Sequence, residues 1–228
     1  MRWHGAGGFF TGVEMDCGPG CDLSLVEMSR PLPPVALASR SPRRRELLES
    51  HGLAHAVVDS DIDDGDLAPG SSCPRAWVMS LAYLKAAAGL RQAGGTLDAD
   101  WVVLGADTIC VQDGRIIGQP EDAAEAEAIV RGFCGRVHEV LTGVALIDAG
   151  SFRRVIFLEI AAVEVGLIGD SEVDSYICSG SWQGKAGAYN LSERLEAGWP
   201  ITYCGDAEGI MGLPMGSLKA RLGELVEG

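Results

Sequence analysis

The sequence lacks the features of a membrane protein or a nucleic-acid-binding protein. It has no run of 18 or more apolar residues, the length that a bilayer-spanning helix needs, and its N-terminus lacks the charged and apolar segments of a secretory signal. Basic residues are scarce, because 18 lysines and arginines stand against 32 aspartates and glutamates, giving a net charge of -14. Such a surface repels nucleic acid and anionic lipid. We therefore expect a cytoplasmic protein without nucleic-acid or membrane partners.

The chain also lacks a disulfide framework and internal repeats. Its seven cysteines are odd in number and irregularly spaced, which is typical of reduced thiols. Cys17 and Cys21 lie four positions apart, but no second pair or histidine cluster accompanies them, so we predict no zinc site there. A length of 228 residues with 47% apolar residues is typical of a single globular domain.

The chain divides into two parts of different character. Residues 1–33 contain six glycines and three prolines without helical or strand periodicity, and we interpret them as a flexible extension. Residues 34–228 interleave strand and helix patterns, which predicts an α/β domain with a mixed central sheet flanked by helices. The predicted strands are 35–38, 101–104, 109–111, 139–147 and 155–165, and the predicted helices are 42–50, 76–93, 123–133, 171–178 and 217–226.

Single residues refine the ends of these elements. Gly105 is expected to break one strand into two, because glycine weakens a strand. Asp113 and Gly114 form a dipeptide typical of a hairpin turn. Ser171 and Ser217 are candidate N-caps for the last two helices.

The strongest local signal for function is a group of arginines where a strand passes into a helix. Residues 39–45 read SRSPRRR, with four arginines in an otherwise acidic chain. Ser41 suits the N-cap and Pro42 the first position of the helix. The N–H groups and dipole of a helix N-terminus favour an anion, and arginine adds donors that match phosphate oxygens. A solvated basic helix start is the alternative, and Arg40 or Arg45 belongs to the surface if the first turn spreads the side chains apart.

The second signal is the segment GADT at residues 105–108, which places a carboxylate and a hydroxyl at the end of a strand. Asp107 there could hold Mg²⁺ and orient or deprotonate a water molecule for attack on phosphorus. The alternative is an aspartate that only forms a turn. Asp61, Asp63 and Asp64 lie in an acidic loop that could supply a second oxygen ligand, or that is simply solvated.

Three further titratable residues stand outside these two segments. Lys85 and Lys185 are isolated cations beside small residues, and each could reach a phosphate, although a surface lysine is the default interpretation. His138 titrates near neutral pH. Because it stands among strand residues, we interpret it as structural.

Taken together, several segments resemble the Maf family in the same order along the chain. The resemblance runs from Pro34 to the C-terminus and leaves the N-terminal extension outside. The segments that carry it are Leu37–Arg44, Leu104–Thr108, Gly135–Gly143, Gly184–Tyr189 and Gly212–Pro214.

The resemblance implies a fold, an activity and partners. Maf proteins are nucleoside triphosphate pyrophosphatases with a mixed α/β fold of the Maf/ITPase kind. The expected reaction is attack of water at the α-phosphorus, dependent on a divalent metal, Mg²⁺ or Mn²⁺, and the expected assembly is a homodimer. Pro42–Arg44 and Ala186–Tyr189 are similar to the branch that prefers dTTP and UTP.

The resemblance also implies roles for individual residues. Asp107 corresponds to the proton acceptor, Arg44 and Lys85 to phosphate-binding cations, and Arg43, Thr108 and Ser192 to positions that set base preference. The predicted substrate-binding residues are Ser41, Arg43, Arg44, Lys85, Thr108, Gln119, Lys185 and Ser192, and the predicted metal ligands are Asp64 and Asp107.

Three departures from the family pattern bear on the substrate. Gln119 replaces a lysine, Asp64 replaces a glutamate, and Ser192 with Glu193 replaces a glutamine and a glycine. The first alternative is therefore the same reaction on a modified or purine nucleotide. The second is a nucleotide-binding regulator of cell division with little catalysis, although Asp107 argues against it, since a pure binder gains nothing from a negative charge beside phosphates.

Overall fold

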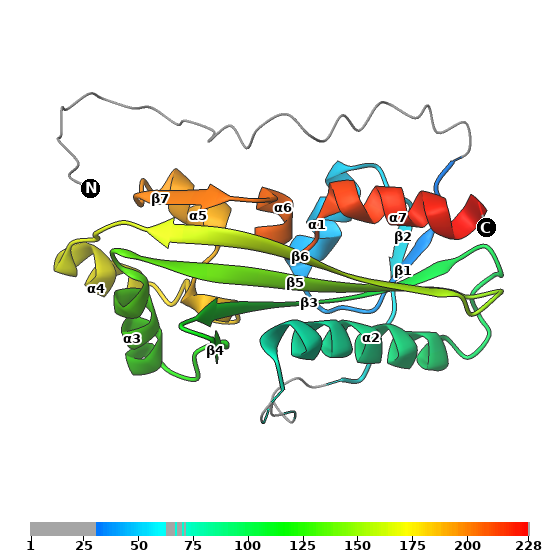
Figure 1. The fold of residues 1–228 in the computed structure, drawn as a ribbon, viewed down its shortest axis with the longest axis horizontal. Coiled ribbons are helices and arrows are strands. Elements are labelled where there is room, and N and C mark those ends of the chain that lie inside the picture. Colours follow the sequence, from blue (N-terminus) through cyan, green and yellow to red (C-terminus); the bar gives the residue numbers. More distant parts are fainter. Residues whose placement is uncertain (1–30, 63–66, 68–69, 71, 228) are drawn as a thin grey trace, which may run out of the picture.

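The computed structural model of the chain describes residues 31–62, 67, 70 and 72–227 (Figure 1). The predicted extension lies outside these residues except for 31–33, and so do Cys17, Cys21, Asp63 and Asp64. Leu32 already packs against the buried core of the domain. Within the described part of the chain, no helix is both long and apolar enough to cross a membrane.

One seven-stranded sheet forms the centre of the fold, in the order β2-β1-β3-β5-β6-β7, with β4 paired to β3. β1 is parallel to both of its neighbours, and the other pairs are antiparallel. The predicted mixed sheet is therefore confirmed. Its strands are β1 (Val35–Leu37), β2 (His55–Val57), β3 (Val102–Gln112), β4 (Arg115–Ile117), β5 (Arg136–Asp148), β6 (Arg154–Val165) and β7 (Ile201–Cys204).

Helices cover both faces of the sheet. Figure 1 shows α2 on one face, with α1 and α7 on the other. The side chains of β1 alternate accordingly: Leu37 packs with α1 and α7, whereas Ala36 packs with α2. The helices are α1 (Pro42–Ser50), α2 (Pro74–Ala93), α3 (Ala123–Phe133), α4 (Asp170–Cys178), the 3₁₀ turn η2 (Ala186–Ala188), α5 (Leu191–Glu196), α6 (Ala207–Ile210) and α7 (Met215–Glu227).

Glycines allow α2 to lie very close to the sheet. A Cβ atom added to Gly105 on β3 would lie 2.2 Å from the carbonyl oxygen of Ala82 and 2.5 Å from the backbone nitrogen of Ala86. Gly143 on β5 faces the backbone of α2 in the same way. The predicted break at Gly105 is wrong, because β3 runs through this residue without interruption. Glycine is required here for close packing and does not mark a turn.

Two of the three serines predicted as N-caps, Ser171 and Ser217, do not occupy the N-cap positions of their helices. Ser171 lies inside α4, whose N-cap is Gly169. Ser217 is the third residue of α7, and its hydroxyl donates to Glu159 at 3.1 Å. α7 begins earlier than predicted, at Met215, whose fully buried side chain belongs to the core that the helix covers.

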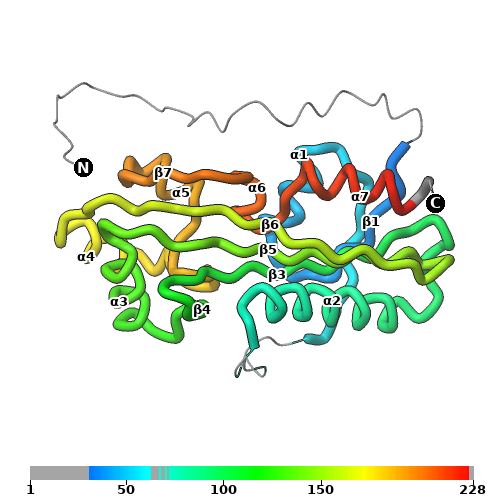
Figure 2. Tube along the Cα trace, in the orientation of Figure 1, coloured from blue at the N-terminus to red at the C-terminus, as the bar shows by residue number. Residues whose placement is uncertain are grey.

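The short helices and strands have too few residues to show a hydrophobic period in the sequence. Asp113 and Gly114 both have positive φ and form the predicted hairpin turn, which joins β3 to β4. Sequence analysis gave no range for β2, β4, η2, α5, α6 or β7, which have three to six residues each and are too short to show a period, although it predicted the turn before β4. Figure 2 shows the C-terminal segment running beside α1 and β1, so the two ends of the described domain meet.

Candidate active site

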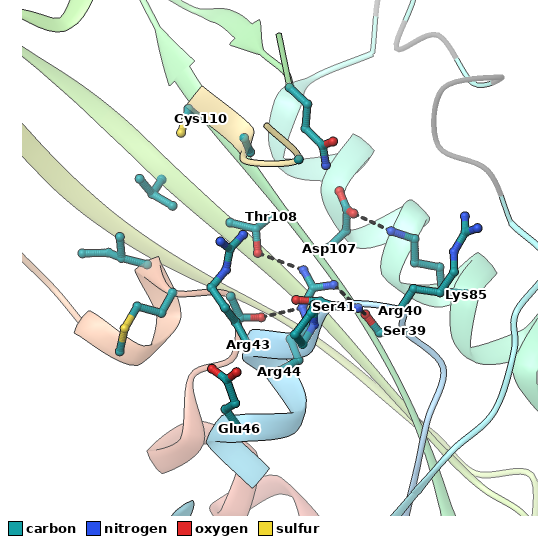
Figure 3. Close-up of a pocket in the computed structure, with 18 of the residues that line it drawn as sticks. Ser39, Arg40, Ser41, Arg43, Arg44, Glu46, Lys85, Asp107, Thr108 and Cys110 are labelled. Carbon is teal, nitrogen blue, oxygen red and sulfur yellow. Dashed lines mark hydrogen bonds and ion pairs between the residues drawn. The ribbon is translucent and has the colours of Figure 1, made fainter. Parts of the chain in front are cut away.

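A cavity of about 670 Å³ opens where β1 ends and α1 begins (Figure 3). The C-terminal half of the chain completes its wall through Tyr189, Glu193 and residues 210–212. The predicted site residues that line it are Ser41, Arg43, Arg44, Lys85, Asp107, Thr108 and Gln119. Lys185 and Ser192 are not part of its wall, and Asp64 lies outside the described residues.

The N-terminus of α1 faces this cavity without a side-chain cap. Ser41 is at the N-cap position and Pro42 is the first helical residue, as predicted, but the Ser41 hydroxyl makes no capping bond. Its backbone N–H donates to Ser39 Oγ at 3.2 Å. Since the first turn contains no acidic residue, the positive end of the helix dipole remains available to an anionic ligand.

Arg44 joins three segments of the cavity wall. Its side chain is buried, and its Nε donates to the carbonyl oxygen of Gly212 at 2.9 Å. Its Nη1 donates to Ser39 Oγ at 3.0 Å, and its Nη2 donates to Thr108 Oγ1 at 3.1 Å. These bonds fix the plane of the guanidinium group, which makes Arg44 a rigid part of the site.

The other arginines of the cluster divide between cavity and surface. Arg40 and Arg43 line the cavity, and Arg43 is half-buried. Arg45 is exposed and does not line it. Three of the four arginines therefore share the cavity, while the helical turn places the fourth outside it.

Asp107 and Lys85 form a buried ion pair inside the cavity. Lys85 Nζ lies 2.7 Å from Asp107 Oδ1, and the two side chains are only 9% and 11% exposed. Figure 3 shows Lys85 extending from α2 toward Asp107 on β3. The pair is possible because α2 approaches the sheet so closely at Gly105. The lysine balances the charge of the carboxylate and fixes its orientation.

The first turn of α5 brings Glu193 to the cavity in place of Ser192. Glu193 lines the cavity and forms an ion pair with Lys185. The Ser192 hydroxyl donates to Asn190 Oδ1 at 2.8 Å. Asn190 also accepts the backbone N–H of Glu193 and so caps α5. The proposed roles of Lys185 and Ser192 in substrate binding remain predictions.

His138 is buried behind the cavity, in agreement with its interpretation as structural. It is 2% exposed, stacks on Phe133 with the ring centroids 3.9 Å apart, and lies 2.9 Å from the hydroxyl of Tyr189. Burial lowers the pKa of His138 to about 4 from its ordinary value of 6.5. The imidazole is therefore neutral at physiological pH and supports Tyr189, which does line the cavity.

This lowered pKa predicts a loss of stability in acid. Between pH 6.5 and 4 the unfolded chain binds a proton at His138 that the folded chain does not, so the free energy of unfolding falls as the pH falls. The expected loss between pH 7 and pH 4 is on the order of 3 kcal/mol. Urea denaturation of the wild type and His138→Gln at several pH values measures it. An equally steep decline in both proteins would show that other groups cause it.

Sequence reasoning assigned no role to Thr142, although it lies directly behind the site. The register of the sheet places Thr142 on β5 opposite Thr108 on β3, with their hydroxyl oxygens 3.0 Å apart. Thr142 also donates to the carbonyl oxygen of Gly209 at 2.8 Å. Only the strand register brings these residues together, and no local pattern in the sequence contains it.

Comparison with known proteins places this chain in a family. Residues 34–225 match the family described as Maf-like protein. The chain is 36% identical over 192 residues to the dTTP/UTP pyrophosphatase of Alkaliphilus metalliredigens, covering 84% of this chain and 94% of the relative. It is 38% identical to the dTTP/UTP pyrophosphatase of Chromobacterium violaceum, covering 83% and 93%. It is also 36% identical to the nucleoside triphosphate pyrophosphatase of Xylella fastidiosa, covering 78% and 92%. The chain therefore belongs to the Maf-like protein family.

Proposed function

We propose that this chain hydrolyses nucleoside triphosphates, with dTTP and UTP as substrates, to the monophosphate and pyrophosphate. The observation that carries the proposal is the composition of the cavity. In a chain with a net charge of -14, the cavity gathers Arg40, Arg43, Arg44 and Lys85 with Asp107, the one buried carboxylate among its described lining residues. Hydrolysis of a polyphosphate requires cations for the phosphates and one group that accepts a proton from water.

The cationic part of the cavity suits a triphosphate. The backbone of the α1 N-terminus offers N–H donors, and Arg43 and Arg44 follow in its first turn. Bidentate donors and a helix dipole stabilise the charge that builds up on the leaving pyrophosphate. Because bonds to Gly212, Ser39 and Thr108 already orient Arg44, little reorganisation is needed when the charge develops.

Asp107 serves as the general base in this proposal. It accepts a proton from a water molecule as the water oxygen forms a bond to the α-phosphorus. The bond between the α-phosphorus and the bridging oxygen then breaks, and pyrophosphate leaves with the electron pair. Lys85 holds one carboxylate oxygen of Asp107 at 2.7 Å and so fixes the direction from which the proton is taken.

The residues of the cavity fit a divalent cation, Mg²⁺ or Mn²⁺. Asp107 provides a hard carboxylate oxygen, and Mg²⁺ is usually held by one or two carboxylates together with substrate phosphates. Among the described residues, no group of three or more histidine, cysteine, aspartate or glutamate side chains is placed so that it could hold a metal ion by itself. In this proposal Asp107, the substrate phosphates and Asp64, the ligand predicted from the sequence, would hold it. When bound, the ion would lower the pKa of a coordinated water and neutralise phosphate charge.

The names of the relatives support dTTP and UTP as substrates, and one observation favours a second candidate. Glu193 brings a carboxylate to the cavity wall, and a carboxylate accepts hydrogen bonds but cannot donate them. The edge of uracil or thymine has carbonyl oxygens on both sides of its single N–H, whereas guanine offers two adjacent donors. The second candidate is therefore the same reaction on a purine or modified nucleotide.

Pyrophosphate release from a panel of canonical and modified nucleoside triphosphates, with Mg²⁺ or Mn²⁺, tests the proposal. We expect the highest kcat/KM for dTTP and UTP. Faster release from a purine nucleotide, with the order reversed in Glu193→Gln, would support the second candidate. Tight nucleotide binding without any release would contradict both and favour a binding protein.

A further inference from the structure

A chain of hydrogen bonds runs behind the cavity wall from Arg44 to the loop that contains α6. Arg44 Nη2 donates to Thr108 Oγ1 at 3.1 Å, and Thr108 Oγ1 lies 3.0 Å from Thr142 Oγ1. Thr142 Oγ1 in turn lies 2.8 Å from the carbonyl oxygen of Gly209. Thr142 is 1% exposed, whereas Thr108 is half-buried and lines the cavity. Of the two threonines, therefore, Thr108 is the one placed to contact a ligand.

Counting protons fixes the direction of every bond in this chain. A carbonyl oxygen only accepts, so the single hydroxyl proton of Thr142 goes to Gly209. The contact between the two threonine hydroxyls must then use the proton of Thr108. A guanidinium group only donates, so Arg44 occupies one lone pair of Thr108.

After these bonds, Thr108 has one lone pair and no proton left for a ligand. A threonine hydroxyl ordinarily rotates to donate or accept as its partner requires. Here Thr108 donates its proton to Thr142 and accepts from Arg44, so toward a ligand it can only accept. A ligand N–H or O–H placed at Thr108 would gain a hydrogen bond, whereas a ligand carbonyl would meet a second oxygen lone pair and remain unpaired, which is costly in a partly desolvated site.

We propose that Thr142 is a positioning residue that makes Thr108 an obligate hydrogen-bond acceptor, so that the site selects substrates bringing an N–H or O–H donor to Thr108. This inference rests on the proposed function. Two groups of dTTP have the required chemistry, namely the N3–H of the base and the 3′-hydroxyl of the sugar. One lone pair serves only one of them.

The test compares the wild type, Thr142→Val and Thr142→Ser on three nucleotides. These are dTTP, 3-methyl-dTTP, which lacks the base donor, and 2′,3′-dideoxythymidine triphosphate, which lacks the sugar donor. The quantity compared is the ratio of kcat/KM for dTTP to kcat/KM for each analogue. For the wild type we expect this ratio to be about ten with one analogue only. Thr142→Ser keeps this ratio because it keeps the hydroxyl. In Thr142→Val the Thr108 proton is free to turn toward the cavity, and the ratio shrinks to about twofold.

Thr142→Val is a suitable variant because it leaves no other group unpaired. The carbonyl oxygen of Gly209 still accepts the backbone N–H of Gly212 at 3.0 Å. Urea denaturation of each variant checks folding. If Thr142→Val does not fold, Thr108→Val replaces it, since removing the acceptor abolishes the same ratio. Where both variants fold, the double variant Thr108→Val with Thr142→Val is expected to show the same ratio as Thr108→Val alone.

Three results would overturn the inference. The first is a wild type that discriminates against neither analogue or equally against both. The second is an unchanged ratio in Thr142→Val, and the third is a ratio in Thr142→Ser that shrinks as much as in Thr142→Val. Failure of the proposed function can be told apart from failure of this inference, because the wild type would then release no pyrophosphate from dTTP. The same ratios would in that case be taken from dissociation constants measured by calorimetry.

Discussion

Asp107→Asn is expected to lower kcat for pyrophosphate release by about a thousandfold, the range of a lost general base. Asparagine has nearly the same shape, but its amide neither accepts the proton of water nor offers an anionic oxygen to a divalent ion. Initial rates with dTTP under saturating Mg²⁺ or Mn²⁺ measure the effect. Because Asp107 is buried against Lys85, the fold of the variant must be checked by circular dichroism and urea denaturation.

A matched control distinguishes loss of the base from a general change of charge in the cavity. Glu46 is an exposed carboxylate that lines the same cavity. Glu46→Gln removes one negative charge, as Asp107→Asn does, and is expected to change kcat by less than about threefold. The double variant Lys85→Met with Asp107→Asn removes the uncompensated lysine and is expected to stay inactive. A severalfold loss or less in Asp107→Asn would refute the assignment of the base.

Gly105→Ala is expected to destabilise the domain by about 3 kcal/mol or more. The added methyl group would lie 2.2 Å from a carbonyl oxygen and 2.5 Å from a backbone nitrogen of α2, so no side-chain rotation relieves the clash. The helix must move away from the sheet, which also separates Lys85 from Asp107. Urea denaturation measures the loss of stability, and pyrophosphate release by the folded fraction measures the damage to the site.

Gly216→Ala provides the control for this substitution. A Cβ atom at Gly216 in α7 has no neighbour within 4 Å, and alanine favours a helix over glycine. Its effect on the free energy of unfolding is expected to be neutral or slightly stabilising, by less than about 1 kcal/mol. Equal stability losses at the two positions would mean that close packing of α2 is not what Gly105 provides.

The contrast between these two glycines shows what the sequence could reveal about the fold. Long periodic segments, such as α2 and β6, were predicted within a few residues because their apolar spacing extends over many positions. Gly105 was read as a break because glycine usually interrupts a strand. Its actual role depends on how closely a helix packs on the sheet, and that distance is set by residues far apart in the chain.

In the candidate site, too, local sequence patterns predicted some features, whereas others depend on the three-dimensional fold. The arginine cluster and Asp107 were found because each belongs to a local pattern at the end of a strand. The ion pair between Asp107 and Lys85 could not be predicted, since it needs the placement of α2 on β3. The carbonyl group of Gly212, which orients Arg44, belongs to the backbone and leaves no trace in residue type.

The bond between Arg44 and Gly212 also determines when the cavity can form during biosynthesis. These residues stand 168 positions apart, and His51 at the end of α1 contacts Glu208, 157 positions away. During translation the arginine segment emerges from the ribosome long before the C-terminal segment that contains Gly212 has been synthesised. Contacts of such long sequence separation form late and slowly. A cell therefore obtains a complete cavity only from chains translated at least as far as Gly212, the last residue that lines it.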